Sequence, residues 1–366
     1  MVKLIEEKDE NGSINVKLVG VGNAGSNIVS RIYGAIQGIT FVVFNTDANA
    51  LKYSKADVKT QIGEKTTHGR GTGKDPEKGK FAANEDQETI REVLKNADIV
   101  FLVAGLGGGT GTGSSPIIAK IAKDNGAIVI SIITTPFEFE GERRIAHAKK
   151  GMEMLESNVD TLIHIPNQKI YELVDEKTPL PDAFARVDEK ISRTVASITD
   201  LIYKQKFLDI DFTDICSIVE NAGRGIVGLG YGKGEGRMEN AARTTIDDPL
   251  IEKSEIMEAK NILISITGSS DLSLKEVGEA MNLIQTRISC PSKVLGVTID
   301  PQLEDEVHIT LLATGIGGIK PRMESPLRRP ASEKKPEELP LIRNEREDEY
   351  IDTPPLLRKK KPGGQL

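Results

Sequence analysis

The 366-residue sequence predicts an α/β fold: a doubly wound domain, a long central helix, a second and smaller α/β domain, and a disordered C-terminal tail. Three patterns support this prediction. Apolar strands alternate with helical segments over residues 16–165, which is typical of a parallel sheet covered on both faces. Residues 187–202 then carry one apolar helix face. A second alternation follows, and prolines and mixed charges dominate from residue 320 onward.

The first domain contains short, continuous apolar runs that we interpret as buried strands, because β-branched and aromatic residues are frequent in them. These runs lie at residues 16–19, 40–44, 99–103, 128–133 and 161–165. Helical spacing predicts a helix after residue 27 and further helices at 89–94, 116–123 and 142–156. The polar, glycine-rich stretch 55–75 predicts a loop with one short strand.

The long helix is predicted from apolar residues that recur at steps of three or four and so share one face. These residues are Val187, Ile191, Val195, Ile198 and Ile202. In the second α/β unit we expect helices at residues 237–245 and 273–288, and strands at 225–231, 260–267, 294–299 and 307–314.

Composition and charge argue against several classes of protein. The formal net charge is −7, whereas dedicated nucleic-acid binders carry a basic footprint. Aromatic residues make up 4% of the chain, too few for base-stacking platforms. Two cysteines and four scattered histidines predict neither a disulfide framework nor a metal site. We see no run of ~18 apolar residues and no signal peptide, and therefore expect a cytoplasmic protein without membrane insertion.

The first glycine loop follows a predicted strand and fits the pattern G-x-G-x-x-G at Gly20, Gly22 and Gly25. Such a loop lets the backbone approach a phosphate at a helix N-terminus. Asp47 follows at the end of the next strand, as in a dinucleotide fingerprint. A tight structural turn and a nicotinamide-dependent oxidoreductase both remain open at this point.

The second glycine loop, residues 104–113, holds six glycines in ten residues between a strand and a helix. So many glycines cost conformational entropy, which makes sense if backbone N–H groups wrap several phosphate oxygens. Thr110 and Thr112 add hydroxyl donors. A third loop, residues 68–75, misses the P-loop pattern because Asp75 follows Lys74 and His68 replaces the first glycine. It could still close over a terminal phosphate. Two phosphate loops favour a nucleoside triphosphate over a dinucleotide.

The glycine run 107–113 resembles the signature loop of the tubulin/FtsZ family of GTPases. Further motifs at residues 45–47, 136–141, 165–167 and 211–214 follow in the order found in its bacterial cell-division branch. The resemblance covers residues 14–316 and the terminal peptide, and implies a tubulin/FtsZ-like fold. We therefore expect a flexible arm at 1–13, a GTP-binding domain at 14–182, the central helix at 183–208, a GTPase-activating α/β domain at 209–318, a flexible linker at 319–347 and a partner-docking tail at 348–366.

The resemblance implies GTP or GDP as the bound nucleotide, with Mg²⁺ held mainly by phosphates and water. The residues that it places at the nucleotide are Gly22, Asn23, Ala24, Gly25, Ser26, Asn27, Asn45, Gly71, Gly73, Gly108, Gly109, Thr110, Gly111, Thr112, Gly113, Glu140, Arg144, Asn167, Phe184 and Asp188. Phe184 and Asp188 are four residues apart and share a helix face if the long helix has begun there. Phe184 can stack on a purine, and the Asp188 carboxylate can accept two hydrogen bonds from guanine, a donor pair that adenine lacks. A solvated carboxylate at a helix start is the alternative for Asp188.

Asp211 and Asp214 lie in an acidic segment that residues alone would identify as a solvated loop. The resemblance implies instead that they act on the nucleotide of the neighbouring subunit in a head-to-tail homopolymer. Two departures from the family pattern are Asp209, where asparagine is usual, and Lys74, where a small residue is common. The glycine-rich segment 223–236 has no functional explanation at this stage. A paralogue that assembles without hydrolysing GTP is a further alternative.

The terminal residues 348–361 resemble the peptide with which the family docks on membrane-tethering division proteins such as FtsA. Its apolar residues Ile351, Pro354, Leu356 and Leu357 precede the basic run 358–361. The resemblance therefore implies a cytokinetic-ring protein that lies beneath the membrane at mid-cell.

Overall fold

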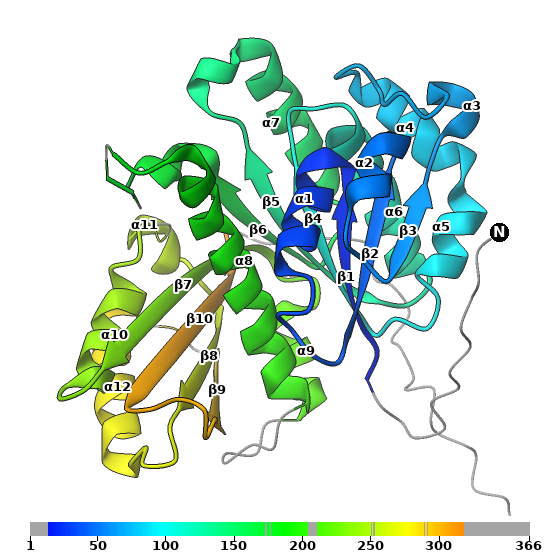
Figure 1. The fold of residues 1–366 in the computed structure, drawn as a ribbon. Coiled ribbons are helices and arrows are strands. Elements are labelled where there is room, and N and C mark those ends of the chain that lie inside the picture. The colour runs from blue at the N-terminus through cyan, green and yellow to red at the C-terminus, as the bar shows by residue number, and fades with distance from the viewer. Residues whose placement is uncertain are drawn as a thin grey trace, which may run out of the picture. The chain divides into compact units, whose positions relative to one another are not determined.

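The computed structural model describes residues 14–317 apart from residues 173, 176, 204–210, 250, 252, 289 and 291. Its centre is one ten-stranded sheet with the order β3-β2-β1-β4-β5-β6-β7-β10-β8-β9 (Figure 1). The strands are β1 Val16–Val21, β2 Ile39–Asn45, β3 Val58–Gln61, β4 Ile99–Gly105, β5 Ile128–Thr135, β6 Thr161–Pro166, β7 Gly223–Lys233, β8 Asn261–Gly268, β9 Ser292–Ile299 and β10 Glu306–Ile316.

All strand pairs from β3 to β7 are parallel, and β10 runs antiparallel to both β7 and β8. The helices of the first half are α1 Gly22–Ile32, α2 Ala48–Tyr53, α3 Glu64–Thr67, α4 Pro76–Glu85, α5 Gln87–Val93, α6 Thr110–Asp124 and α7 Glu142–Glu156. Short 3₁₀ helices lie at Glu138–Glu140 (η1) and Asn167–Glu172 (η2). The remaining helices are α8 Leu180–Tyr203, α9 Phe212–Val219, α10 Arg237–Ile246, α11 Lys253–Ile256 and α12 Leu274–Arg287.

Two hydrophobic clusters cover the two faces of the parallel strands. One joins Val16 and Leu18 of β1 with residues of α1, α8 and α9, and the other joins Val19 and Val21 with residues of α5, α6 and α7. A third cluster lies between β7–β10 and the helices α10 and α12. This arrangement confirms the prediction of a doubly wound domain and a second, smaller α/β unit. Within the described residues, no helix is long and apolar enough to cross a membrane.

The central helix α8 begins at Leu180, three residues before the predicted start, and it is described as far as Tyr203. Its predicted apolar face is buried at Val187, Ile191, Val195 and Ile198. A buried ion pair between Lys190 and Asp248 fastens this helix to the segment that follows α10. The predicted end of the helix at residue 208 lies outside the described residues.

Helices α1, α3 and α6 depart from the expectation of loops, and α3 lies within the stretch 55–75 that was predicted as a loop with one short strand. Helix α1 starts at Gly22 and α6 at Thr110, both inside stretches expected to be glycine loops. Helix α4 occupies residues that carried no prediction, although Asp75 caps its N-terminus and Pro76 occupies its first turn, a known start signal. The strands thus lead almost directly into helices whose N-termini face one edge of the sheet.

The glycine-rich segment 223–236 finds its explanation in packing. Gly228, Gly230 and Gly232 alternate along β7, so they lie on the same face of the strand. A Cβ on Gly230 would lie 2.0 Å from the carbonyl oxygen of Ala241, and one on Gly232 would lie 1.8 Å from that of Arg237. Both carbonyls belong to α10, which therefore packs directly on the backbone of β7.

Candidate functional site

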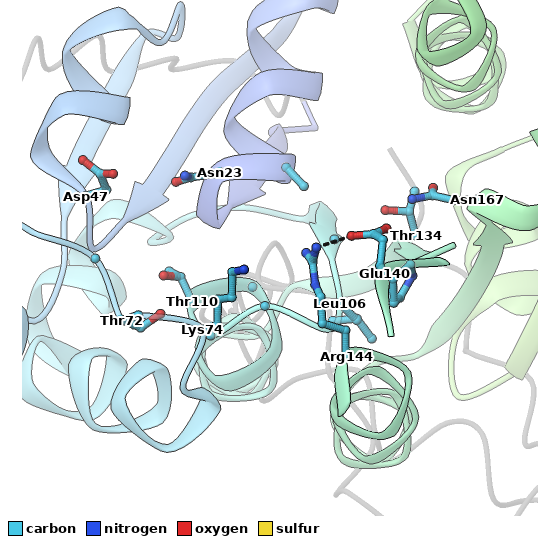
Figure 2. Close-up of a pocket in the computed structure, with 18 of the residues that line it drawn as sticks. Asn23, Asp47, Thr72, Lys74, Leu106, Thr110, Thr134, Glu140, Arg144 and Asn167 are labelled. Atoms are coloured by element: carbon cyan, nitrogen blue, oxygen red, sulfur yellow. Dashed lines mark hydrogen bonds and ion pairs between the residues drawn. The ribbon is translucent and has the colours of Figure 1, made fainter. Parts of the chain in front are cut away.

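A cavity of about 480 Å³ lies at the carboxyl ends of the parallel strands (Figure 2). This is the edge where open α/β sheets bind their ligands, and the volume suits a nucleotide. The N-termini of α1 and α6 both contribute to its wall, through Asn23 and Ala24 and through Thr110 and Gly111. Two helix N-termini offer free N–H groups and positive dipole ends, the natural partners of phosphates.

The cavity brings together most of the residues predicted for the nucleotide. The lining residues from that set are Asn23, Ala24, Gly71, Gly73, Gly108, Gly109, Thr110, Gly111, Glu140, Arg144, Asn167 and Phe184. Among the described residues, those of the set that lie outside the lining are Gly22, Gly25, Ser26, Asn27, Asn45, Thr112, Gly113 and Asp188. The nucleotide contacts of the whole set stay predictions.

Several glycines of the first two loops are required by backbone packing. A Cβ on Gly25 would lie 2.4 Å from the carbonyl oxygen of Val103, and one on Gly113 would lie 1.9 Å from that of Pro76. By contrast, a Cβ added to Gly108 would meet nothing within 4 Å. A side chain at Gly108 would therefore extend into the open space of the cavity. Gly25 and Gly113 instead let neighbouring backbone segments approach closely.

Buried polar residues hold the two helix N-termini in place. The fully buried Asn45 donates from Nδ2 to Asn23 Oδ1 at 2.9 Å and to Ser26 Oγ at 3.1 Å. Asn45 thus positions Asn23, which lines the cavity. Thr112 also supports the cavity indirectly, because its hydroxyl accepts a hydrogen bond of 2.9 Å from the N–H of Gly107 in the second glycine loop.

Glu140 and Arg144 form an ion pair at the wall of the cavity, shown by the dashed line in Figure 2. Glu140 Oε1 also accepts a hydrogen bond of 3.0 Å from the N–H of Phe137, which closes the turn of η1. The Nε of Arg144 is buried and lacks a hydrogen-bond partner among the described residues. A buried, unpaired donor on a cation is an energetic cost that an anionic ligand would relieve.

Aromatic side chains border the cavity at the start of α8. Phe184 lies edge-on to Phe137, with ring centroids 6.1 Å apart, and Phe139 stacks on Phe137 at 4.9 Å. Asp188 follows one turn later on α8, is 5% exposed, and pairs with Arg31 of α1. Because Asp188 is buried, the alternative of a solvated carboxylate is wrong. Burial raises the pKa of Asp188, and Arg31 opposes that rise.

Further lining residues were not selected from the sequence. They are Asp47, Arg70, Thr72, Lys74, Gly105, Leu106, Thr134 and Pro136. Asp47 was considered only as the acidic residue of a dinucleotide fingerprint, and its carboxylate instead accepts hydrogen bonds from the N–H groups of Asn49 and Ala50 at the start of α2. Their common signal is position, since each lies at the end of a strand, within two residues after one, or in the third glycine loop.

Asp211 and Asp214 lie far from this cavity. Asp211 caps α9, where its Oδ1 accepts 2.9 Å from the N–H of Asp214, and bonds from Thr213 lower its pKa. The end of α9 bonds to the opposite edge of the sheet, because the carbonyl oxygen of Val219 accepts from Thr161, the first residue of β6. Figure 1 shows α9 at the lower end of α8. The start of α8, at the other end of that helix, carries Phe184, which lines the cavity. A helix of 24 residues spans about 36 Å.

Comparisons with known proteins agree with this geometry. The model of the Tubulin/FtsZ family, GTPase domain, matches residues 15–175, and that of the FtsZ family, C-terminal domain, matches residues 223–317. A mutant FtsZ from M. jannaschii is 37% identical, with a TM-score of 0.77 over 83% of this chain and 92% of that one. An FtsZ dimer of the same organism, described as empty, is 34% identical, with a TM-score of 0.77 over 88% and 96% of the two chains.

The GDP-bound CetZ1 monomer from Haloferax volcanii is 21% identical, with a TM-score of 0.72 over 84% of this chain and 95% of that one, and shares the fold. Fold and site thus define a GTPase, and the chain belongs to the tubulin/FtsZ family. Its second domain is similar to the C-terminal domain of the FtsZ family.

No group of three or more His, Cys, Asp or Glu side chains in the described part of the chain is arranged to hold a metal ion. The cations at the cavity are side chains, namely Arg70, Lys74 and Arg144. The family assignment removes the support for a nicotinamide-dependent oxidoreductase, because the first glycine loop belongs to a GTPase domain.

Proposed function

We propose that this chain is a GTP-hydrolysing subunit that polymerises head-to-tail, and that each catalytic site is completed between adjacent subunits. The observation that supports the proposal is the separation of the cavity and the Asp211–Asp214 pair at opposite edges of one sheet. Carboxylates on α9 cannot reach the nucleotide of their own chain. A second copy stacked along the strands would bring its α9 to the cavity, and an FtsZ relative has been solved as a dimer.

Within this proposal, the N-termini of α1 and α6 bind the phosphates, and Phe184 with Asp188 binds the guanine base. Glu140 and Arg144 lie where ribose and phosphate oxygens would meet them. Mg²⁺ would be held mainly by phosphates and water and would neutralise developing charge. Asp211 and Asp214 of the neighbour would position the attacking water, which is the usual protein contribution to phosphoryl transfer to water.

The first experiment measures phosphate release with GTP and Mg²⁺ as the protein concentration rises, with light scattering in parallel and ATP as a control. Turnover per subunit should rise above the concentration at which scattering appears, and only with GTP. A turnover per subunit that does not change with concentration would contradict a site shared between subunits.

A mixing experiment tests the shared site directly. The Asp214→Ala variant should bind GTP but should not complete its neighbour's site. The Gly108→Asp variant should bind no GTP, because its carboxylate enters a space where an added Cβ meets nothing within 4 Å and repels phosphate. Each variant alone should be inactive, and their mixture should recover turnover at interfaces that pair an intact cavity with an intact α9. A mixture that stays inactive while it still forms polymer would refute the arrangement.

We extend the proposal to cell division on the strength of the FtsZ relatives. The filaments would form the cytokinetic ring in the cytoplasm, beneath the membrane at mid-cell. Residues 348–361 would dock on a membrane-tethering protein of the FtsA kind, although this segment and the preceding linker lie outside the described residues. Deletion of residues 348–366 should leave GTP turnover unchanged and abolish recruitment of filaments to tether-bearing vesicles. Recruitment by the truncated chain would contradict this assignment.

A further inference from the structure

The third glycine loop brings two cationic side chains to the cavity, and the proposed phosphate contacts at the N-termini of α1 and α6 give them no role. Arg70 and Lys74 line the cavity together with Arg144, against the carboxylates of Asp47 and Glu140. Glu140 is paired with Arg144, and Asp47 is engaged by the N–H groups at the start of α2. Lys74 has no ion-pair partner among the described residues. Figure 2 shows its side chain pointing into the cavity.

The backbone of this loop is fixed against the N-terminus of α6. The N–H of Gly71 donates to the Thr46 carbonyl oxygen at 3.2 Å, and the N–H of Asp75 donates to that of Thr72 at 3.2 Å. A Cβ on Gly109, the N-cap of α6, would lie 2.0 Å from Thr72 Oγ1. The loop is thus pressed against the point where α6 presents its N–H groups.

Lys74 itself has a φ of 67°, in the left-handed region that a non-glycine residue rarely occupies. Residues in this region are found repeatedly at ligand clamps, where surrounding structure maintains them. Here Asp75 N-caps α4 directly after Lys74, and Gly73 precedes it. The strained position places the only lysine of the cavity lining beside Thr72 and Thr110, on the side of the cavity away from Asn167 (Figure 2).

We propose that the Lys74 ammonium binds the terminal phosphate of a nucleoside triphosphate and so determines the preference of this site for the triphosphate over the diphosphate. This inference rests on the proposed function, because it takes GTP as the ligand. A diphosphate anchored at the N-termini of α1 and α6 leaves Lys74 unpaired. A third phosphate adds negative charge on the side of the third loop, where an ammonium can form a charge-assisted hydrogen bond.

The test compares affinities for GTPγS and GDP, measured by fluorescent-nucleotide competition with EDTA and separately with Mg²⁺, below the concentration at which scattering appears. Lys74→Ala should weaken GTPγS binding about tenfold and GDP binding less than twofold. Lys74→Arg should restore the preference. Alanine is the appropriate truncation, because it keeps the Cβ and therefore the conformational cost of a positive φ. Glycine would remove the charge and would also relieve the backbone strain.

Lys78→Ala is the matched control, because it removes the same charge from the neighbouring helix α4 at a residue outside the cavity lining. It should leave the ratio of the two affinities unchanged. Raising the salt concentration should reduce that ratio in the wild type and leave it nearly constant in Lys74→Ala, since the added contact is ionic.

Equal weakening of GTPγS and GDP binding by Lys74→Ala would overturn the proposal, as would an unchanged preference. An effect that appears only above the scattering threshold would also overturn it, because Lys74 would then act on a neighbouring subunit. These outcomes are distinct from failure of the proposed function, in which the wild-type chain itself would bind neither guanine nucleotide.

Discussion

Arg31 in the last turn of α1 donates a hydrogen bond of 2.9 Å from Nη2 to the carboxylate of Asp188 on α8. The Asp188 side chain is 8% exposed, whereas that of Arg31 is 47% exposed. Burial alone raises the pKa of Asp188, and the guanidinium counteracts that effect. Arg31 therefore supplies the counter-charge for a buried carboxylate that lies one helical turn from Phe184, a residue of the cavity lining.

Replacing Asp188 with alanine should weaken GTP binding by about ten- to a hundredfold and leave the weak binding of ATP unchanged. Under the proposed function, the guanine N–H donors would lose the carboxylate that accepts their hydrogen bonds, whereas adenine has no such donor pair. Competition against a fluorescent guanine nucleotide measures both affinities. Glu189→Ala removes a carboxylate from the neighbouring, exposed position of α8 and should change neither. A parallel fall in GTP and ATP binding would show that Asp188 acts on fold rather than on base recognition.

Replacing Lys190 with methionine should lower the free energy of unfolding by about 3–5 kcal/mol, because it leaves the Asp248 carboxylate buried without its cation. The Lys190→Met/Asp248→Leu double variant should recover part of this loss but not all, since the N–H of Leu229 also donates to Asp248 at 3.0 Å. Urea unfolding of the single and double variants measures the coupling. Additive losses in the cycle would mean that the ion pair does not fasten α8.

Replacing Gly230 with alanine should lower the free energy of unfolding by at least 2 kcal/mol, roughly the cost of overpacking a core. The added Cβ would lie 2.0 Å from the carbonyl oxygen of Ala241 and 2.0 Å from Thr245 Oγ1. Gly278→Ala is the control with the same chemical change, at an open position of α12 with nothing within 4 Å. It should raise stability by about 0.5–1 kcal/mol, since alanine favours the helix. Thermal unfolding curves should therefore shift in opposite directions.

Acidification should destabilise the fold between about pH 6.5 and pH 4. Burial lowers the pKa of His164 to about 4, and its Nε2 lies 2.8 Å from the Thr135 hydroxyl. Burial and then Arg193 also lower the pKa of His308. A histidine with a lowered folded pKa contributes stability that is complete above its unfolded pKa near 6.5. That stability is lost as the pH falls toward the folded value, because the unfolded chain binds the proton first.

The slope of unfolding free energy against pH in this window should decrease in His164→Gln, by up to about 1.4 kcal/mol per pH unit for a single proton. Chemical denaturation at several pH values provides the slope. His68→Gln is the control, because the His68 side chain is exposed to solvent. An unchanged slope in His164→Gln would mean that this imidazole is protonated equally in both states.

The sequence predicted what depends on local pattern. Continuous apolar runs predicted the parallel strands, and the spacing of apolar residues predicted α7 at the bounds that the structure shows, Glu142–Glu156. The glycine loops predicted the end of the sheet at which the cavity lies, because strands that lead directly into helices bring the helix N-termini to that end. These features are encoded within about twenty neighbouring residues, and tertiary contacts did not override them.

What escaped prediction depends on contacts between distant segments. Thr134 and Arg70 line the cavity only because β5 and the third loop end beside β4 and β2. The glycines of β7 are explained only by the approach of α10, and the pairing of Asp188 with Arg31 joins residues 157 positions apart. Sequence spacing carries no information about such neighbours without the strand order.

The seam between β6 and β7 has a mechanical consequence. The two halves of the chain share one sheet, yet these strands pair over only three residue positions, from Thr161 with Gly223 to Ile163 with Gly225. In a filament stacked along the strands, tension would pull the cavity edge of each subunit against the α9 edge. The pairing of β6 with β7, which is the shortest in the described sheet, would then be loaded in shear, with α8 alongside it. In such a filament, the deformation of each subunit under tension would be concentrated at the short pairing of β6 with β7.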